Sequence, residues 1–255
     1  MKLDEEKESY FANRLGERFI TNEGYWLTII NYRKAIDCDI QFDNGLIVKN
    51  IRYGNIKRGH VRNLMHPCAY GVGFHSVGKY SQKSHPNIHD KWNKILCRGY
   101  STNYHSKQPS YINCSVDKRW HNFQVFAEWH DKNFNSEIMQ KWCLDKDILI
   151  KGNKIYSPDT CCFVPHEINN LFVKKNLNRG EYPIGVHKHG NGYQSHCNVN
   201  NKRVSLGTFS TPEEAFQVYK IAKEKEIKRV ADKWKDKITE KTYYAMYNYQ
   251  VEITD

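Results

Sequence analysis

The chain has 255 residues, in which 39 Lys and Arg stand against 28 Asp and Glu, for a formal charge of +11 at pH 7. This length allows one to three domains. No apolar run approaches the roughly 20 residues of a membrane span. The acidic start MKLDEEKESY is not typical of a signal peptide. We therefore expect a cytoplasmic protein without a membrane partner. The positive charge favours a polyanionic partner, most often nucleic acid.

The first 82 residues are predicted to form a β-rich module. Charged residues indicate a short helix over 3–17. From 21 to about 80, alternating apolar and polar residues predict a small antiparallel β unit that includes RYGNIKRGHV at 52–61. The turn at Asp43–Gly45 favours a hairpin, because Asn and Gly tolerate positive φ. The segment SQKSHPN at 81–87 is predicted to be a linker.

Residues 88–176 are predicted to form a mixed module. A helix expected over 119–134 carries an aromatic stripe, which is more typical of a core than of a functional site. The stripe consists of Trp120, Phe123, Phe126 and Trp129. The other elements expected here are a helix at 89–96, a strand at 144–150 and a helix at 164–176. Nothing in the sequence indicates export, so we expect the eight cysteines to be reduced thiols. They include no C-x-x-C pair, so we expect no zinc site.

Residues 183–237 are the clearest unit, with three short strands expected within 185–209, a helix over 210–237 and a tail at 238–255. If one face of the sheet packs on the helix, alternation leaves polar, basic and amide side chains on the other face. These are His187, His189, Gln194, His196, Asn198, Arg203 and Ser205. Such a face suits the reading of bases in the major groove, although an ordinary solvated face has a similar composition.

The string LGTFSTPEEA at 206–215, which follows GYQS at 192–195, resembles the Apetala/ERF-type DNA-binding domain in its phage and integrase-associated form. In that family a three-stranded sheet enters the major groove. The resemblance places the polar residues named in the preceding paragraph, except His189, at the family's contact positions. Plant members use mostly Arg and Trp there, so a target sequence does not carry over. The resemblance implies double-stranded DNA as the partner.

The motifs WNKILCRGY at 92–100, LDKDIL at 144–149 and INNLF at 168–172 occur in the order found in phage HNH homing endonuclease-like proteins, which this chain resembles. HNH nucleases hold one divalent metal, such as Mg²⁺ or Mn²⁺, and the resemblance places its ligands at Asp145 and Asn169. Lys146 occupies the position of the general-base histidine, and Lys is a poor base near neutral pH because its usual pKa is ~10.4. Asp147 can replace that base, and so can three histidines: His121, His130 and His166.

The expected fold class is α+β, with an N-terminal β module, a central ββα-type HNH-like core and a C-terminal three-stranded sheet plus helix. Two functions stay open. One is a phage-type, site-specific DNA endonuclease that hydrolyses phosphodiester bonds. The other is an inactive DNA-binding regulator, or an accessory factor that contacts a host protein through the N-terminal module. Either would act in the cytoplasm of the host cell.

Overall fold

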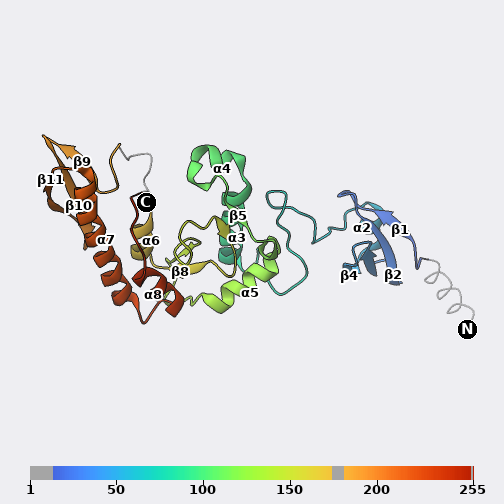
Figure 1. Ribbon diagram of the computed structural model, residues 1–255. Coiled ribbons are helices and arrows are strands. Elements are labelled where there is room, and N and C mark those ends of the chain that lie inside the picture. The colour runs from blue at the N-terminus through green and yellow to red at the C-terminus, as the bar shows by residue number, and fades with distance from the viewer. Residues whose placement is uncertain (1–13, 174–180, 254) are drawn as a thin grey trace, which may run out of the picture. The chain divides into compact units, whose positions relative to one another are not determined.

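The computed structural model describes residues 14–173, 181–253 and 255. It divides into two compact units, unit 1 with residues 1–104 and 118–127, and unit 2 with residues 105–117 and 128–255. Both mix helices with small sheets (Figure 1), which confirms the α+β class. The helix expected over 3–17 lies mostly outside the described residues, of which 14–16 form a turn. No helix in the described part of the chain is long and apolar enough to cross a lipid bilayer.

Unit 1 begins with a four-stranded antiparallel sheet whose strands lie side by side in chain order. The strands are β1 (Arg18–Ile20), β2 (Trp26–Lys34), β3 (Asp37–Phe42) and β4 (Ile47–Ile51). Alternate side chains of β2 and β3, such as Leu27 and Ile40, are fully buried and form the core on one face of the sheet. The predicted hairpin turn is present, with Gly45 at a φ of 85°.

The prediction of a strand over 52–61 is wrong. Residues Tyr53–Lys57 form the short helix α2, in which Ile56 is buried in the core of the sheet and Tyr53 packs partly against that core. Residues three apart lie on one side of a helical turn but on opposite faces of a strand, so the spacing of Tyr53 and Ile56 favours the helix. From Arg58 to His85 the chain forms turns and isolated bridges instead of further strands.

The second part of unit 1 is built on the helix α3 (Pro86–Tyr100). It begins inside the predicted linker, because Pro suits the first turn of a helix. Its Trp92 is fully buried and donates from Nε1 to the carbonyl oxygen of Trp120 at 2.7 Å. Of the short elements that follow, η2 (Lys118–His121) belongs to unit 1 and η1 (Pro109–Tyr111) to unit 2, while α4 (Thr102–Lys107) and α5 (Phe123–Asn133) have residues in both units.

The aromatic stripe expected on one helix is confirmed as core. Trp120, Phe123 and Phe126 are fully buried in unit 1, whereas Trp129 packs against the core of unit 2. The helix starts later than expected, at Phe123, because Trp120 belongs to η2.

Unit 2 contains a small ββα element. Strand β6 (Cys143–Asp145) pairs antiparallel with β8 (Cys162–Val164), and α6 (His166–Phe172) follows directly. A second pair, β5 (Ser115–Val116) and β7 (Ile155–Tyr156), is parallel. The strand expected to continue to residue 150 ends at Asp145, since Oδ1 of Asp145 accepts the backbone N–H groups of Asp147 and Ile148, both at 2.9 Å, and turns the chain.

Residues 183–237 contain the three strands and the helix that the sequence predicts, whereas the expected tail at 238–255 contains a further helix. Strands β9 (Val186–His189), β10 (Gly192–Val199) and β11 (Lys202–Phe209) form an antiparallel sheet in the order β11-β10-β9. Helix α7 (Pro212–Trp234) contacts all three strands on one face (Figure 1), and α8 (Glu240–Tyr247) packs on α7. The turn between β10 and β11 uses Asn200 and Asn201 at positive φ.

The ββα element and the C-terminal sheet share one hydrophobic core. Trp142, Phe163 and Ile168 from the first belong to the same buried cluster as Tyr219 and Val230 from α7. The boundary expected between 176 and 183 therefore lies within one packed unit, and the expected module 88–176 contributes residues to both units. A truncation near residue 180 would expose this core, so a functional test requires the full chain.

The start of α7 gives a testable contribution to stability. Thr211 Oγ1 accepts the backbone N–H of Glu214 at 3.2 Å, and Glu214 Oε2 accepts the backbone N–H of Thr211 at 3.3 Å. We expect Thr211→Ala to lower the free energy of unfolding by about 1 kcal/mol in urea titration, because the first turn loses its cap. Thr211→Ser, which keeps the hydroxyl, is the control, and an equal loss in both variants would contradict a role for the cap.

Candidate nucleic-acid interface

The three-stranded sheet has one buried and one accessible face. In β10, Ser195 and Cys197 are buried against α7, while His196 is half-buried and Asn198 is exposed. The polar side chains are therefore on the side away from the helix, as the alternation predicts.

The strand register shows which predicted contact residues meet. Asn198 lies directly opposite Arg203, and His196 lies opposite Ser205. The rings of His187 and His196 stack at 4.8 Å between centroids, and Gln194 Nε2 donates to Ser205 Oγ at 3.2 Å. Six of the seven predicted residues thus form one continuous surface, which we call the outer face, and the seventh, His189, lies opposite Gly192 at the end of β9.

Sequence reasoning missed one member of the outer face. The register shifts between Ser195 and His196, so Leu206 is an extra residue in β11, and exposed Thr208 is opposite Gln194. A bulge of this kind has no clear signal in the sequence beyond Gly207, which adopts a φ of 123°.

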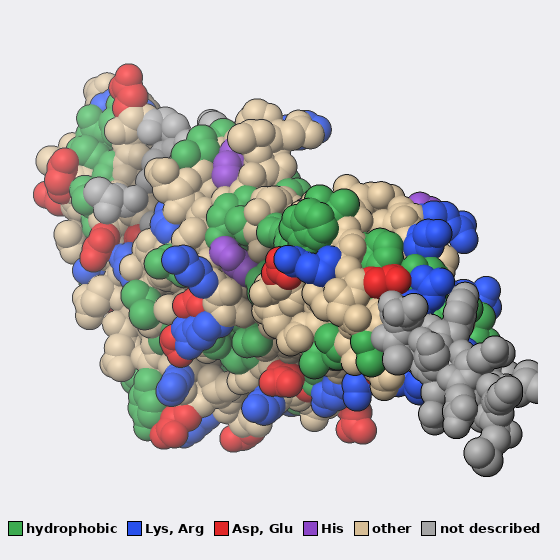
Figure 2. All heavy atoms as spheres, turned by 90° about the vertical axis from the view of Figure 1, so that its right-hand side faces the viewer, with side chains coloured by type: hydrophobic (Ala, Val, Ile, Leu, Met, Phe, Trp, Pro, Cys, Tyr) green, Lys and Arg blue, Asp and Glu red, His purple; other side chains and the backbone are tan. Residues whose placement is uncertain are grey.

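The charge of this region has one sign. The sequence from Tyr182 to Pro212 contains no Asp or Glu, but it contains Lys188, Lys202 and Arg203. By contrast, the face drawn in Figure 2 mixes Lys and Arg with Asp and Glu. Partial burial lowers the pKa of His196, and Arg203 and the neighbouring histidines lower it further, so His196 is neutral near pH 7. The outer face therefore presents cationic and neutral donors without a carboxylate that would repel phosphate.

A buried carboxylate of α7 holds the turn beside the outer face. Glu226 is 5% exposed; its Oε1 accepts the backbone N–H of Asn200 at 2.9 Å, and both of its carboxylate oxygens accept from Arg229 at 2.8 Å. This role has no signal in the sequence, where Glu226 is one of several charged residues of a long helix.

In the ββα element, the residues that the HNH resemblance selects are mostly occupied by the fold. Asp145 holds the turn described above. Lys146 is buried and donates from Nζ to Asp147 Oδ2 at 3.2 Å and to the carbonyl oxygen of Asn153 at 3.1 Å. Asn169 is half-buried on α6, which packs on β6. The structure thus brings these residues into one element, but it uses Asp145 and Lys146 to shape the loop after β6.

The fold already uses part of this set of side chains. Oδ1 of Asp145 already accepts two backbone N–H groups, and the ammonium of Lys146 lies at Asp147. Within the described residues, no group of three or more His, Cys, Asp or Glu side chains is arranged to hold an ion.

Burial, and then the neighbouring charge of Asp147, raise the pKa of Asp145 to about 6. Since an unfolded Asp titrates near ~3.9, the ionised form costs stability in the folded state. We expect the free energy of unfolding to fall, on the order of 2 kcal/mol, as the pH rises from about 4 to 7. Asp145→Asn keeps an oxygen for the two N–H groups and should remove most of this slope in urea titrations across that range. An unchanged slope would assign the pH dependence to another group.

The histidines considered as replacement bases lie in different surroundings. His121 belongs to unit 1 and lies 2.8 Å from the hydroxyl of Tyr100. His130 is buried against the rings of Phe134 and Phe163. His166 is exposed at the start of α6, with Nδ1 at 3.3 Å from Cys143 Sγ, so it is the one of the three that belongs to the ββα element.

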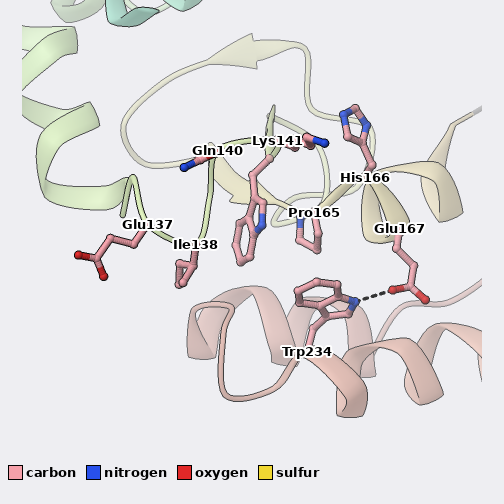
Figure 3. Close-up of a pocket in the computed structure, with 9 residues that line it drawn as sticks. Glu137, Ile138, Gln140, Lys141, Pro165, His166, Glu167 and Trp234 are labelled. Carbon is pink, nitrogen blue, oxygen red and sulfur yellow. Dashed lines mark hydrogen bonds between the residues drawn. The ribbon is translucent and has the colours of Figure 1, made fainter.

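An open hollow of about 480 Å³ lies in unit 2 between Trp142, α6 and the end of α7 (Figure 3). Figure 3 shows Glu167 directed toward Trp234, whose Nε1 donates to Glu167 Oε2 at 2.8 Å. Lys233 also donates to Glu167, at 2.7 Å. Because the Glu167 carboxylate is already paired, its interactions are explained by the packing of α6 on α7 without a ligand.

No protein-family model, curated protein or solved structure matches this chain.

Proposed function

We propose that this protein binds double-stranded DNA through the outer face of the β9–β10–β11 sheet. The observation that supports this most directly is the exposed cross-strand pair of Asn198 and Arg203 on a sheet without acidic residues. Amide and guanidinium groups are the side chains that pair in bidentate fashion with purine edges in the major groove. The resemblance to the Apetala/ERF-type domain supports the same partner.

The test is a fluorescence-anisotropy titration of the full chain with a labelled random-sequence duplex and with the corresponding single strand. We expect tighter binding to the duplex and a steep loss of affinity with salt, because each neutralised phosphate releases counterions. Equal or tighter binding to the single strand, or no binding to either, would reject the proposal.

A nuclease function is the second candidate, because β6, β8 and α6 follow one another in the ββα order of the phage HNH proteins that the chain resembles. We expect no metal-dependent nicking of supercoiled plasmid with Mg²⁺ or Mn²⁺, since Asp145 is committed to its turn and Lys146 occupies the base position. The matched control is Asp145→Asn, which preserves an acceptor for the turn. Nicking by the wild-type chain that is lost in Asp145→Asn would establish the endonuclease instead of the DNA-binding regulator.

A further inference from the structure

Unit 1 contains a chain of three hydrogen-bonded side chains that ends at the surface, apart from both candidate sites. Cys68 Sγ lies 3.4 Å from Nδ1 of His75, and Nε2 of His75 lies 3.1 Å from Nε2 of His89. Cys68 is exposed, and the two histidines are half-buried. We infer that Cys68 is a reactive thiol, that His75 accepts its proton, and that His89 holds His75 in position.

The two imidazole rings are fixed by the core of unit 1. Both contact the rings of Trp92 and Phe123, with centroids 5.2 to 5.8 Å apart. The backbone carbonyl of His75 accepts Nε2 of Gln124 at 3.1 Å. The loop that carries Cys68 is pressed against α3, because a Cβ on Gly73 would lie only 2.4 Å from Leu96 Cδ1. The thiol and its base therefore keep their mutual geometry without a ligand.

The protonation states leave Nδ1 of His75 able to accept a hydrogen bond from the thiol. Burial lowers the pKa of both His75 and His89, so both rings are neutral near pH 7. A neutral His75 whose Nδ1 accepts from Cys68 must carry its proton on Nε2, which then donates to His89. This is the arrangement of nucleophile, base and orienting group that activates nucleophiles in general.

A metal ion does not explain the cluster. The two nitrogens of His75 face different partners, Cys68 on one side and His89 on the other. A single ion coordinated by one nitrogen of His75 could not also lie between the other nitrogen and its partner, so the three groups do not converge on one point.

The chemistry assigned to Cys68 is thiol–disulfide exchange with a small disulfide, because an exposed loop thiol meets small solutes directly. His75 takes the thiol proton at Nδ1, and the Cys68 thiolate attacks one sulfur of the disulfide. A new bond forms between Cys68 and that sulfur, the original disulfide bond breaks, and the other half leaves as a thiolate, which receives the proton from His75. No further oxidant is needed, since the disulfide itself is reduced.

The chain offers an internal comparison for the test. Cys143 in unit 2 also faces a histidine, His166 at 3.3 Å, but His166 is exposed and no third described residue is hydrogen-bonded to its ring. Cys97 on α3 is half-buried and reports on the packing of unit 1. In a brief pulse of iodoacetamide on the native full chain at pH 7, read by mass spectrometry, we expect Cys68 to react about 10- to 30-fold faster than Cys143. An ordinary thiol is only ~3% thiolate at that pH.

Oxidised glutathione should form its mixed disulfide first on Cys68. His75→Gln should reduce the labelling of Cys68 by about the same 10- to 30-fold factor, and His89→Gln should reduce it in part. His85→Gln, a matched change in the same segment, should leave it unchanged. The labelling rate of Cys97 shows whether a variant stays folded. Wild-type Cys68 that reacts no faster than Cys143, or a folded His75→Gln chain that keeps the wild-type rate, would overturn the inference.

Discussion

Replacing Arg203 with Ala is expected to weaken binding of the full chain to its preferred duplex by about 5- to 150-fold, because a bidentate contact to a guanine contributes ~1–3 kcal/mol. Arg203 is exposed on the outer face, opposite Asn198. The neighbouring Lys202 lies opposite Val199 on the other side of the sheet, so Lys202→Ala removes the same charge without removing a base contact. Anisotropy titrations of both variants at one salt concentration separate base reading from phosphate attraction.

The cross-strand pair of Asn198 and Arg203 also predicts a base preference. Arg203 is suited to guanine and Asn198 to adenine, and residues directly opposite each other have Cα atoms about 4.5–5.5 Å apart, so both purines should occur at nearby base pairs of the site. Selection from a randomised duplex library checks this. Asn198→Asp should shift one position from adenine toward cytosine, whose N4 amino group donates to a carboxylate. Selected sites that are identical for wild type and Asn198→Asp would contradict the assignment, even if the chain binds DNA.

The C-terminal sheet and helix were predictable because their local signals agree with their packing. The turn at Asn200 and Asn201, the alternation along β10 and the cap at Thr211 each favour the same structure that the core at Cys197 and Tyr219 stabilises. When the local sequence signals and the packing of the core favour the same structure, few alternative folds compete with it. The outer face followed from the alternation alone, apart from Thr208, where the bulge changes the register.

Elsewhere the deciding contacts are distant in sequence. Residues 52–61 mix strand-like alternation with the helical spacing of Tyr53 and Ile56, and the core beneath the N-terminal sheet takes up both side chains from a helix. The sequence identifies Asp145 through a resemblance, but the use of its carboxylate in a turn depends on the backbone path. Cys68 and His89 are 21 positions apart, and no periodic pattern connects them.

Replacing Glu226 with Ala is expected to lower the free energy of unfolding by about 2–3 kcal/mol and to weaken DNA binding as well. The variant leaves the N–H of Asn200 without its acceptor and Arg229 without its carboxylate, and hydrogen bonds to a charged group contribute roughly 1.5–3 kcal/mol. Asn200 begins the turn that connects Asn198 to Arg203. Loss of its hydrogen bond to Glu226 should therefore also disorder Asn198 and Arg203, the two residues proposed to contact bases. Glu226→Gln keeps an acceptor for Asn200 and should retain more of the DNA affinity than Glu226→Ala, as measured by anisotropy.

The ion pair between Glu226 and Arg229 makes the stability that Glu226 contributes depend on pH. The hydrogen bonds from Arg229 hold the pKa of Glu226 below its usual range, so the unfolded chain takes up a proton at a higher pH than the folded chain does. The stabilisation is therefore complete above the unfolded value of ~4.3 and is lost as the pH falls through the lower folded value. The difference in unfolding free energy between wild type and Glu226→Gln should shrink between about pH 5 and pH 3. A constant difference over this interval would show that Glu226 stabilises the turn by packing and not by its charge.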